Sequence, residues 1–268
     1  MGLGDTYNYL FVESSLPYTR EWPLISSPLP LILIIFGYLY FILYVGPCYM
    51  KNRPPFELKT FRLIYDMIQI LVNLWSVKEH ISAGWFVEFN FVFFTCGERH
   101  AMPINANKIF NLVWWLLILK IFDLVETCIF VLRKKQNQVS GLHVYHHISN
   151  LTFGWYYLKY ILDERATFIS LINCAVHVIM YTYYFITTWS LKAQQMVYPI
   201  KPYITNIQMV QFIVIIIILL QLFSPNCEVG VTTIRAAPFF IGNLLIFLYL
   251  FYDFYKKNYT KSSKRKNN

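Results

Sequence analysis

Residues 207–223 read IQMVQFIVIIIILLQLF, a run of 17 residues without a charged side chain. A run of about 17–25 mainly apolar residues is long enough to cross the hydrocarbon core of a bilayer as a helix. Of the 268 residues, 57% are apolar and only 14% are charged, whereas a soluble domain has about 25% charged residues. The composition therefore predicts an all-α membrane protein with several spans.

Six further stretches have the length and apolarity of a span, so seven spans are predicted. The seven cover residues 28–46, about 63 into the eighties, 109–132, 144–162, 166–189, 207–223 and 238–255. Residues 1–27 then form an N-terminal segment, 28–255 a seven-span membrane domain and 256–268 a basic tail. Residues 81–95 are aromatic-rich but contain Glu88 and Asn90, and they could form an interfacial helix, a re-entrant piece or the end of the second span.

Lys and Arg are distributed unevenly among the loops. The loops after the first, third and fifth stretches, together with the tail, hold 15 of them, and the other loops hold 5. Because loops that stay in the cytosol carry the excess of Lys and Arg, we expect a cytosolic C-terminus and a lumenal N-terminus. This distribution also accounts for the net charge of +9, so no nucleic acid is expected as a partner.

Two further expectations follow from this orientation. Cys96 and Cys227 are the only cysteines in lumenal loops, where oxidising conditions allow either a disulfide or two free thiols. Lys264 and Lys266 near the C-terminus resemble a dilysine retrieval signal of the endoplasmic reticulum, although a basic end attracted to anionic lipid is the alternative. The endoplasmic reticulum membrane is the expected location.

Polar and ionisable residues lie inside the predicted spans at helical spacing. Such residues are costly in lipid, so each is a candidate functional residue. Spacings of three, four and seven place them on one face of each helix, where Lys120 can pair with Asp123. By span they are Asp66, Gln69 and Asn73; Lys120, Asp123, Glu126 and Thr127; His143, His146 and His147; Asn173, His177, Tyr181 and Tyr184; and Thr205, Gln208 and Gln211. Each set could be hydrogen-bonding contacts between helices, but together they predict a polar cavity.

Clustered histidines in such a cavity suggest catalysis. A membrane oxygenase or desaturase uses more histidine ligands than the six in this chain, so no metal site is predicted. Without a metal, an imidazole can attack a thioester, and a carbon nucleophile can intercept the resulting acyl-imidazole. Amide side chains can stabilise the oxyanion or enolate. Basic side chains in the cytosolic loops could bind the phosphates of a phosphorylated carrier; they are Arg133, Lys134, Lys135 and Lys201. The alternative is that they are there only because cytosolic loops are rich in Lys and Arg.

Five stretches occur in the order and at the intervals seen in a known family. They are residues 120–127 (KIFDLVET), 130–135 (FVLRKK), 142–147 (LHVYHH), 173–184 (NCAVHVIMYTYY) and 205–211 (TNIQMVQ). On these motifs the chain, over roughly residues 25–260, resembles the very-long-chain fatty acid elongases.

The resemblance implies a 3-oxoacyl-CoA synthase whose catalytic domain is 28–255 and whose last six spans form a barrel around an acyl tunnel. Such an enzyme joins acyl-CoA to malonyl-CoA without a cofactor, alongside the reductases and dehydratase of the elongation cycle, and a homodimer is compatible with it. His146 would be the acyl-accepting nucleophile, and His177 would hold or deprotonate reacting groups. The other implied catalytic residues are His143, His147, Asn173, Gln208 and Gln211.

The chain departs from the family pattern in two places. Asp123 and Glu126 are exchanged relative to the family's Lys-x-x-Glu-x-x-Asp-Thr, and Asp66 stands where Asn is commoner. The alternatives to an enzyme are an elongase-like protein without activity and a seven-span receptor or transporter. The third span lacks an Asp-Arg-Tyr-like end and the seventh an Asn-Pro-x-x-Tyr, which argues against a receptor. The scarcity of Gly and Pro inside the spans argues against a transporter.

Overall fold

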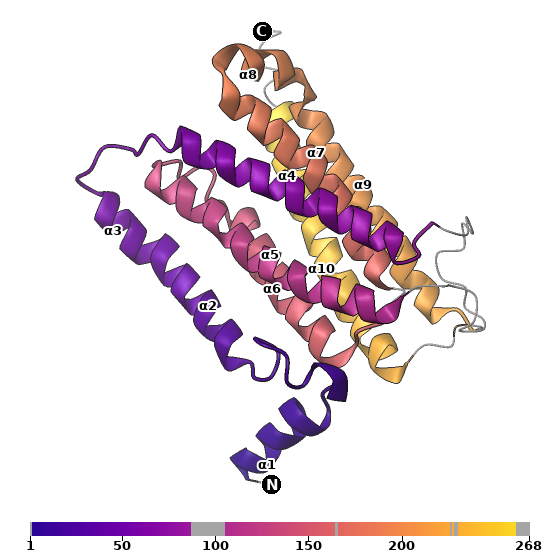
Figure 1. Ribbon diagram of the computed structural model, residues 1–268. Helices are drawn as coiled ribbons and strands as arrows, with labels where there is room; N and C mark the ends of the chain where they lie inside the picture. The colour runs from indigo at the N-terminus through magenta and orange to yellow at the C-terminus, as the bar shows by residue number, and fades with distance from the viewer. Residues whose placement is uncertain (1, 87–104, 164–165, 226, 228–229, 261–268) are drawn as a thin grey trace. The chain divides into compact units, whose positions relative to one another are not determined.

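The structure is a computed structural model that describes residues 2–86, 105–163, 166–225, 227 and 230–260. These residues fold into helices joined by short turns, with no strand among them (Figure 1), so the predicted all-α class is confirmed. The helices are α1 (Leu3–Asn8), α2 (Leu29–Tyr40), α3 (Gly46–Met50), α4 (Lys59–Ser82), α5 (Ala106–Leu132), α6 (Gly141–Tyr160), α7 (Thr167–Trp189), α8 (Leu191–Val197), α9 (Lys201–Leu220) and α10 (Val231–Tyr255). Shorter π- and 3-10 turns are η1 (Tyr9–Glu13), η2 (Pro17–Thr19), η3 (Phe41–Val45), η5 (Tyr198–Ile200), η6 (Gln221–Phe223) and η7 (Lys256–Thr260).

Four helical segments of the described chain are long and apolar enough to cross a bilayer. They are Leu29–Met50, Thr167–Trp189, Leu191–Phe223 and Val231–Tyr259, which overlap four of the predicted stretches. Helices α4, α5 and α6 overlap the other three, but they carry most of the charged and imidazole side chains predicted inside the spans. The count of seven spans and their closure into a barrel stay predictions.

The helices group into two compact units. Unit 1 contains Met1–Glu57 and Val113–Asp163, and therefore α2, α6 and most of α5. Unit 2 contains Leu58–Leu112 and Glu164–Asn268, and therefore α4 and α7 to α10. Each unit brings together segments that are far apart in the sequence, so each has its own set of candidate residues.

The end of α6 holds part of the N-terminal segment in unit 1. Trp155 Nε1 donates to the carbonyl of Leu24 at 2.8 Å, and Lys159 Nζ donates to those of Ile25 and Ser26 at 2.8 and 3.1 Å. Lys159 is 0% exposed, and carbonyl oxygens take the place of water around its ammonium group. These bonds stabilise the left-handed backbone at Leu24, where φ is 68°.

We expect Lys159→Met to destabilise unit 1. The substitution keeps an apolar stem of similar length but leaves the buried carbonyl of Ile25 and the part-buried carbonyl of Ser26 without this donor. A buried group left unsatisfied costs about 1–3 kcal/mol. Thermal unfolding of the purified protein in detergent should therefore show a lower melting temperature. Lys51→Met, at an exposed lysine of the same unit, should leave it unchanged, and equal melting temperatures for the two variants would contradict the assignment.

Helix α4 packs along α7 in unit 2 (Figure 1). Its buried face is polar and consists of Tyr65, Asp66, Gln69, Asn73, Ser76 and His80. His80 is held on both sides, because Nδ1 lies 2.7 Å from the carbonyl of Ser76 and Nε2 lies 2.7 Å from the hydroxyl of Ser170 on α7. This histidine is a structural contact between the two helices.

The remaining helices of unit 2 pack in sequence order. Helix α8 leads from α7 to α9, and α9 packs against both α7 and α10. The contact of α9 with α10 is aromatic: the ring of Phe212 lies 5.5 Å from that of Phe247 and 5.1 Å from that of Phe251. Offset aromatic rings at these distances stabilise a helix pair beyond the area that they bury.

Candidate active site

The turn between α5 and α6 places the first histidines opposite the end of α5. Lys134 adopts a left-handed backbone with φ of 54°, and the N–H of Lys135 donates to the carbonyl of Phe130 at 2.9 Å, which ends α5. The Ser140 hydroxyl accepts from the N–H of His143 at 3.2 Å and caps α6. The two helices then run side by side in opposite directions (Figure 1).

A hydroxyl on α5 links α2 to α6. Thr127 Oγ1 lies 2.9 Å from Tyr38 Oη and 2.9 Å from His143 Nε2. Thr127 is 0% exposed; its bond to Tyr38 is buried, and its bond to His143 is partly buried. A hydroxyl can donate one hydrogen bond and accept others, and the three groups can therefore satisfy one another in either direction. This link fixes the ring of His143.

The three histidines of α6 form one cluster. The ring of His147 lies 4.3 Å from that of His143 and 5.4 Å from that of His146, as the spacing in the sequence predicts. One turn further along, Asn150 Nδ2 lies 2.9 Å from His146 Nε2. In that arrangement the amide N–H donates, so the ring proton sits on Nδ1 and Nε2 carries the lone pair.

Asn150 and Tyr38 are site residues that the sequence analysis missed. The signal for Asn150 was its position four residues after His146, which is one helical turn. Tyr38 gives no such signal, because it lies 89 residues before the threonine that it contacts. Only the packing of α2 in unit 1 brings it to the cluster.

Acidic and basic side chains of α5 surround the histidines. Lys120 Nζ lies 3.4 Å from Asp123 Oδ2, which confirms the predicted pairing along one helix face. Glu126 approaches the cluster itself, since its carboxylate oxygen and one ring nitrogen each of His143 and His147 all lie within 4.8 Å of one another.

Two imidazoles and a carboxylate at this separation could hold a divalent transition metal such as Zn²⁺. The number of histidines in the chain excludes a site with many imidazole ligands, but it does not exclude three ligands of this kind. The sequence signal for them is the four-residue spacing of His143 and His147, which the prediction of no metal site overlooks.

Unit 2 brings a second group of predicted residues together. His177 is buried on α7, with its ring 5.7 Å from that of Tyr181, and Tyr181 lies 6.1 Å from Tyr65 of α4 and 6.0 Å from Tyr184. The ring of Tyr181 is thus a neighbour both of the imidazole of α7 and of a tyrosine on the polar face of α4.

Amide side chains on α7 and α9 complete this group. Asn173 is half-buried on α7, and Gln211 is buried on α9. Gln208 Nε2 donates to Met180 Sδ at 3.2 Å. Because a thioether is a weak acceptor, the Gln208 amide could exchange this contact for a stronger one.

Among the described residues, only some polar side-chain atoms on the buried face of α4 have a hydrogen-bond partner. Gln69 Nε2 donates to Tyr65 Oη at 3.0 Å, and Asn73 Nδ2 donates to the carbonyl and side-chain oxygens of Gln69 at 2.8 and 3.2 Å. Asp66 is 4% exposed, and its Oδ2 has no hydrogen-bond partner among the described residues. A buried carboxylate oxygen without a donor costs free energy.

We expect Asp66→Asn to stabilise the protein. An amide of the same shape removes the cost of burying a carboxylate and adds a donor, and a gain of about 1 kcal/mol corresponds to a rise of about 2–4 °C in melting temperature. Thermal unfolding in detergent measures this, with Glu57→Gln at an exposed position as the control that should not change. A lower melting temperature for Asp66→Asn would show that the carboxylate has a stabilising partner.

The other predicted residues fall as follows. Arg133 is half-buried, and Lys134 and Lys135 are exposed, in the turn between α5 and α6; Lys201 is exposed at the start of α9. Among the described cysteines, Cys48, Cys128 and Cys174 are free and Cys227 is disulfide-bonded. Cys96, Lys264 and Lys266 lie outside the described residues, so the Cys96–Cys227 pairing and the retrieval signal stay predictions.

Comparison with known proteins supplies the family. A family model described as "ELO: GNS1/SUR4 family" matches residues 23–267. The chain belongs to this family. All five motifs lie within the matched residues, and relatives matched over most of the chain are named very long chain fatty acid elongases, so the resemblance to that family is confirmed.

Relatives with assigned names come from insects and mammals. A very long chain fatty acid elongase of Aedes aegypti is 34% identical over 270 residues, which cover 98% of this chain and 72% of the relative. Very long chain fatty acid elongase 7 of Drosophila melanogaster is 33% identical over 260 residues, 96% of this chain and 77% of the relative. Very long chain fatty acid elongase 1 of Mus musculus is 33% identical over 251 residues, which cover 92% of this chain and 88% of the relative.

Proposed function

We propose that this protein elongates fatty acids by condensing an acyl-CoA with malonyl-CoA to give 3-oxoacyl-CoA, carbon dioxide and CoA. Its relatives are named as very long chain fatty acid elongases, which supports the substrate class. The observation that carries the chemistry is the 2.9 Å contact between Asn150 Nδ2 and His146 Nε2 within the histidine cluster. It presents His146 as a neutral imidazole with the lone pair on a defined nitrogen.

In the first step, His146 Nε2 attacks the thioester carbonyl carbon. A C–N bond forms, the C–S bond breaks, and the proton on the ring passes to the leaving CoA thiolate. In the second step, malonyl-CoA loses carbon dioxide, and the electron pair of the broken C–C bond becomes an enolate. The enolate carbon attacks the acyl carbonyl, the C–N bond breaks, and the imidazole takes one proton from water.

Residues of unit 2 have supporting roles in this proposal. His177 holds or deprotonates reacting groups, and amide donors stabilise the oxyanion or enolate. These donors are Asn173, Gln208 and Gln211. Among the described residues the Gln208 amide donates only to a thioether, which is a weak acceptor. The roles rest on the family resemblance.

The proposal includes a location and an orientation. The protein resides in the endoplasmic reticulum membrane with seven spans, a lumenal N-terminus and a cytosolic C-terminus. Arg133, Lys134 and Lys135 lie in the turn at which α6 and its histidines begin, where they could bind the phosphates of CoA. The reductases and dehydratase of the elongation cycle are the enzymes that would use the product.

The direct test is turnover by His146→Ala. Purified protein in detergent receives malonyl-CoA and a panel of acyl-CoAs, and carbon dioxide and 3-oxoacyl-CoA are measured. We expect product from the natural protein and a rate at least about 1000-fold lower from the variant, because removal of a nucleophile costs more than that in comparable enzymes. Gln138→Ala, at an exposed position of the same turn, should keep the full rate.

Two outcomes would contradict the proposal. Undiminished turnover by His146→Ala, at an unchanged melting temperature, would assign the nucleophile elsewhere. Absence of product from folded natural protein across the whole panel would favour an inactive member of the family.

Substitutions of Asn150 test whether Nε2 of His146 is the nitrogen that attacks the thioester. Asn150→Leu removes the donor and should lower kcat by about 10- to 100-fold, with little change in KM, because the ring loses its orienting partner. Asn150→Asp should lower kcat further, since a carboxylate draws a proton onto Nε2 and removes the lone pair. Full activity of Asn150→Asp would mean that the amide oxygen, rather than the N–H, faces His146.

One observation favours a second candidate, a divalent-metal centre formed by Glu126, His143 and His147. The two candidates differ in their response to a chelator. Condensation by the acyl-imidazole route should be unaffected by prolonged treatment with EDTA or phenanthroline. Activity lost to the chelator and restored by Zn²⁺ would assign the chemistry to a metal.

A further inference from the structure

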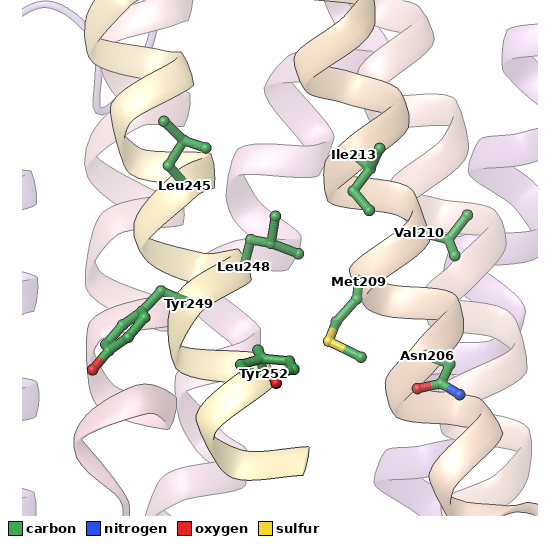
Figure 2. Close-up of a pocket in the computed structure, with 8 residues that line it drawn as sticks. All are labelled: Asn206, Met209, Val210, Ile213, Leu245, Leu248, Tyr249 and Tyr252. Atoms are coloured by element: carbon green, nitrogen blue, oxygen red, sulfur yellow. The ribbon is translucent and has the colours of Figure 1, made fainter. Parts of the chain in front are cut away.

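A groove opens between α9 and α10 in unit 2, with a volume of about 650 Å³. Figure 2 shows that Met209 of α9 and Leu248 and Tyr252 of α10 point into the space between the helices. This volume is within the range of about 300–1,000 Å³ that is usual for ligand sites. The groove is therefore large enough for a ligand rather than a single water molecule.

The walls of the groove are apolar and open outward. Val210 on α9 is 57% exposed, and Leu245 and Tyr249 on α10 are 52% and 69% exposed. Both helices belong to segments that are long and apolar enough to cross a bilayer. Hydrocarbon chains, rather than water or a soluble protein, are the natural neighbours of such a surface.

One end of the groove is polar and basic. Asn206 and Tyr252 line that end (Figure 2), where α9 begins and α10 ends. The helical turn η7, which continues α10, contacts the start of α9, because Tyr259 Oη lies 3.4 Å from Thr205 Oγ1 and Lys201 Nζ lies 5.9 Å from the Tyr259 ring.

Three lysines belong to this end, and one of them is neutralised. Lys257 Nζ forms a 2.6 Å ion pair with Asp253. Lys201 and Lys256 are exposed, and within the described part of the chain neither has an acidic partner. An apolar groove that ends at two unneutralised ammonium groups matches a ligand with a hydrocarbon chain and an anionic head.

We propose that this groove binds an acyl chain of an anionic phospholipid, with the lipid phosphate beside Lys201 and Lys256. The acyl chain lies between α9 and α10, and Asn206 and Tyr252 contact the ester region. The lipid is a structural ligand, so its binding does not depend on the proposed condensation.

The test is lipid binding by the full chain, measured by native mass spectrometry in detergent during titration with phosphatidylserine or phosphatidylcholine. A lysine near an anionic lipid contributes about 1 kcal/mol, or about fivefold in affinity. We therefore expect phosphatidylserine to bind about 25-fold more weakly to the double variant Lys201→Gln, Lys256→Gln. The matched control, Lys51→Gln with Lys59→Gln, removes the same charge from exposed positions elsewhere and should bind as the natural protein does.

A second variant tests the groove separately from its charged end. Met209→Trp fills the space between the helices and should abolish binding of phosphatidylserine while leaving both lysines in place. Ile217→Trp, on the same helix, exposed but not lining the groove, should have no effect. Melting temperatures of the four variants show whether each is folded.

Four results would overturn the proposal. Equal affinity for the two phospholipids would remove the role of the lysines. Loss of binding in the lysine variant but not in Met209→Trp would place the lipid outside the groove. Displacement of phosphatidylserine by palmitoyl-CoA would make the groove a substrate site. A change from dimer to monomer in Met209→Trp would make a second copy of the chain its occupant.

Discussion

The buried hydroxyl of Thr127 connects three helices of unit 1, because it bonds Tyr38 of α2 and His143 of α6 at 2.9 Å each. A buried polar group left unpaired costs about 1–3 kcal/mol, so each of the three groups helps to hold the other two in place. His147 packs against the ring that this bond fixes, and His146 packs against His147. The proposed nucleophile is thus positioned by a series of contacts that begins at a threonine.

Two kinds of polar residue lie within the helices, and their partners distinguish them. Lys159 and His80 are fully buried, with donors and acceptors of the protein around their polar atoms, and both tie one segment of a unit to another. His146 has instead the neutral amide of Asn150 beside its ring, which orients the ring without adding a charge. Among the described residues Gln208 donates only to a thioether, a weak acceptor that a substrate can replace.

The sequence was sufficient for features that depend on spacing along one helix. It predicted the helical class, the cluster of His143, His146 and His147, and the pairing of Lys120 with Asp123. It was insufficient for contacts between segments that are far apart in the chain, such as that of Tyr38 with Thr127, because no pattern within α2 indicates which helix it packs against. The number of spans is the least determined feature, since α4, α5 and α6 carry the polar residues that lower their apolarity.

In the proposed mechanism, His146 carries the acyl group between the two half-reactions. The most direct measurement is mass spectrometry of protein incubated with acyl-CoA in the absence of malonyl-CoA, rapidly quenched and digested. We expect one acyl group on the peptide that begins α6, located on His146 and removed when malonyl-CoA is added. An adduct on another residue, or turnover without any adduct that malonyl-CoA discharges, would contradict it.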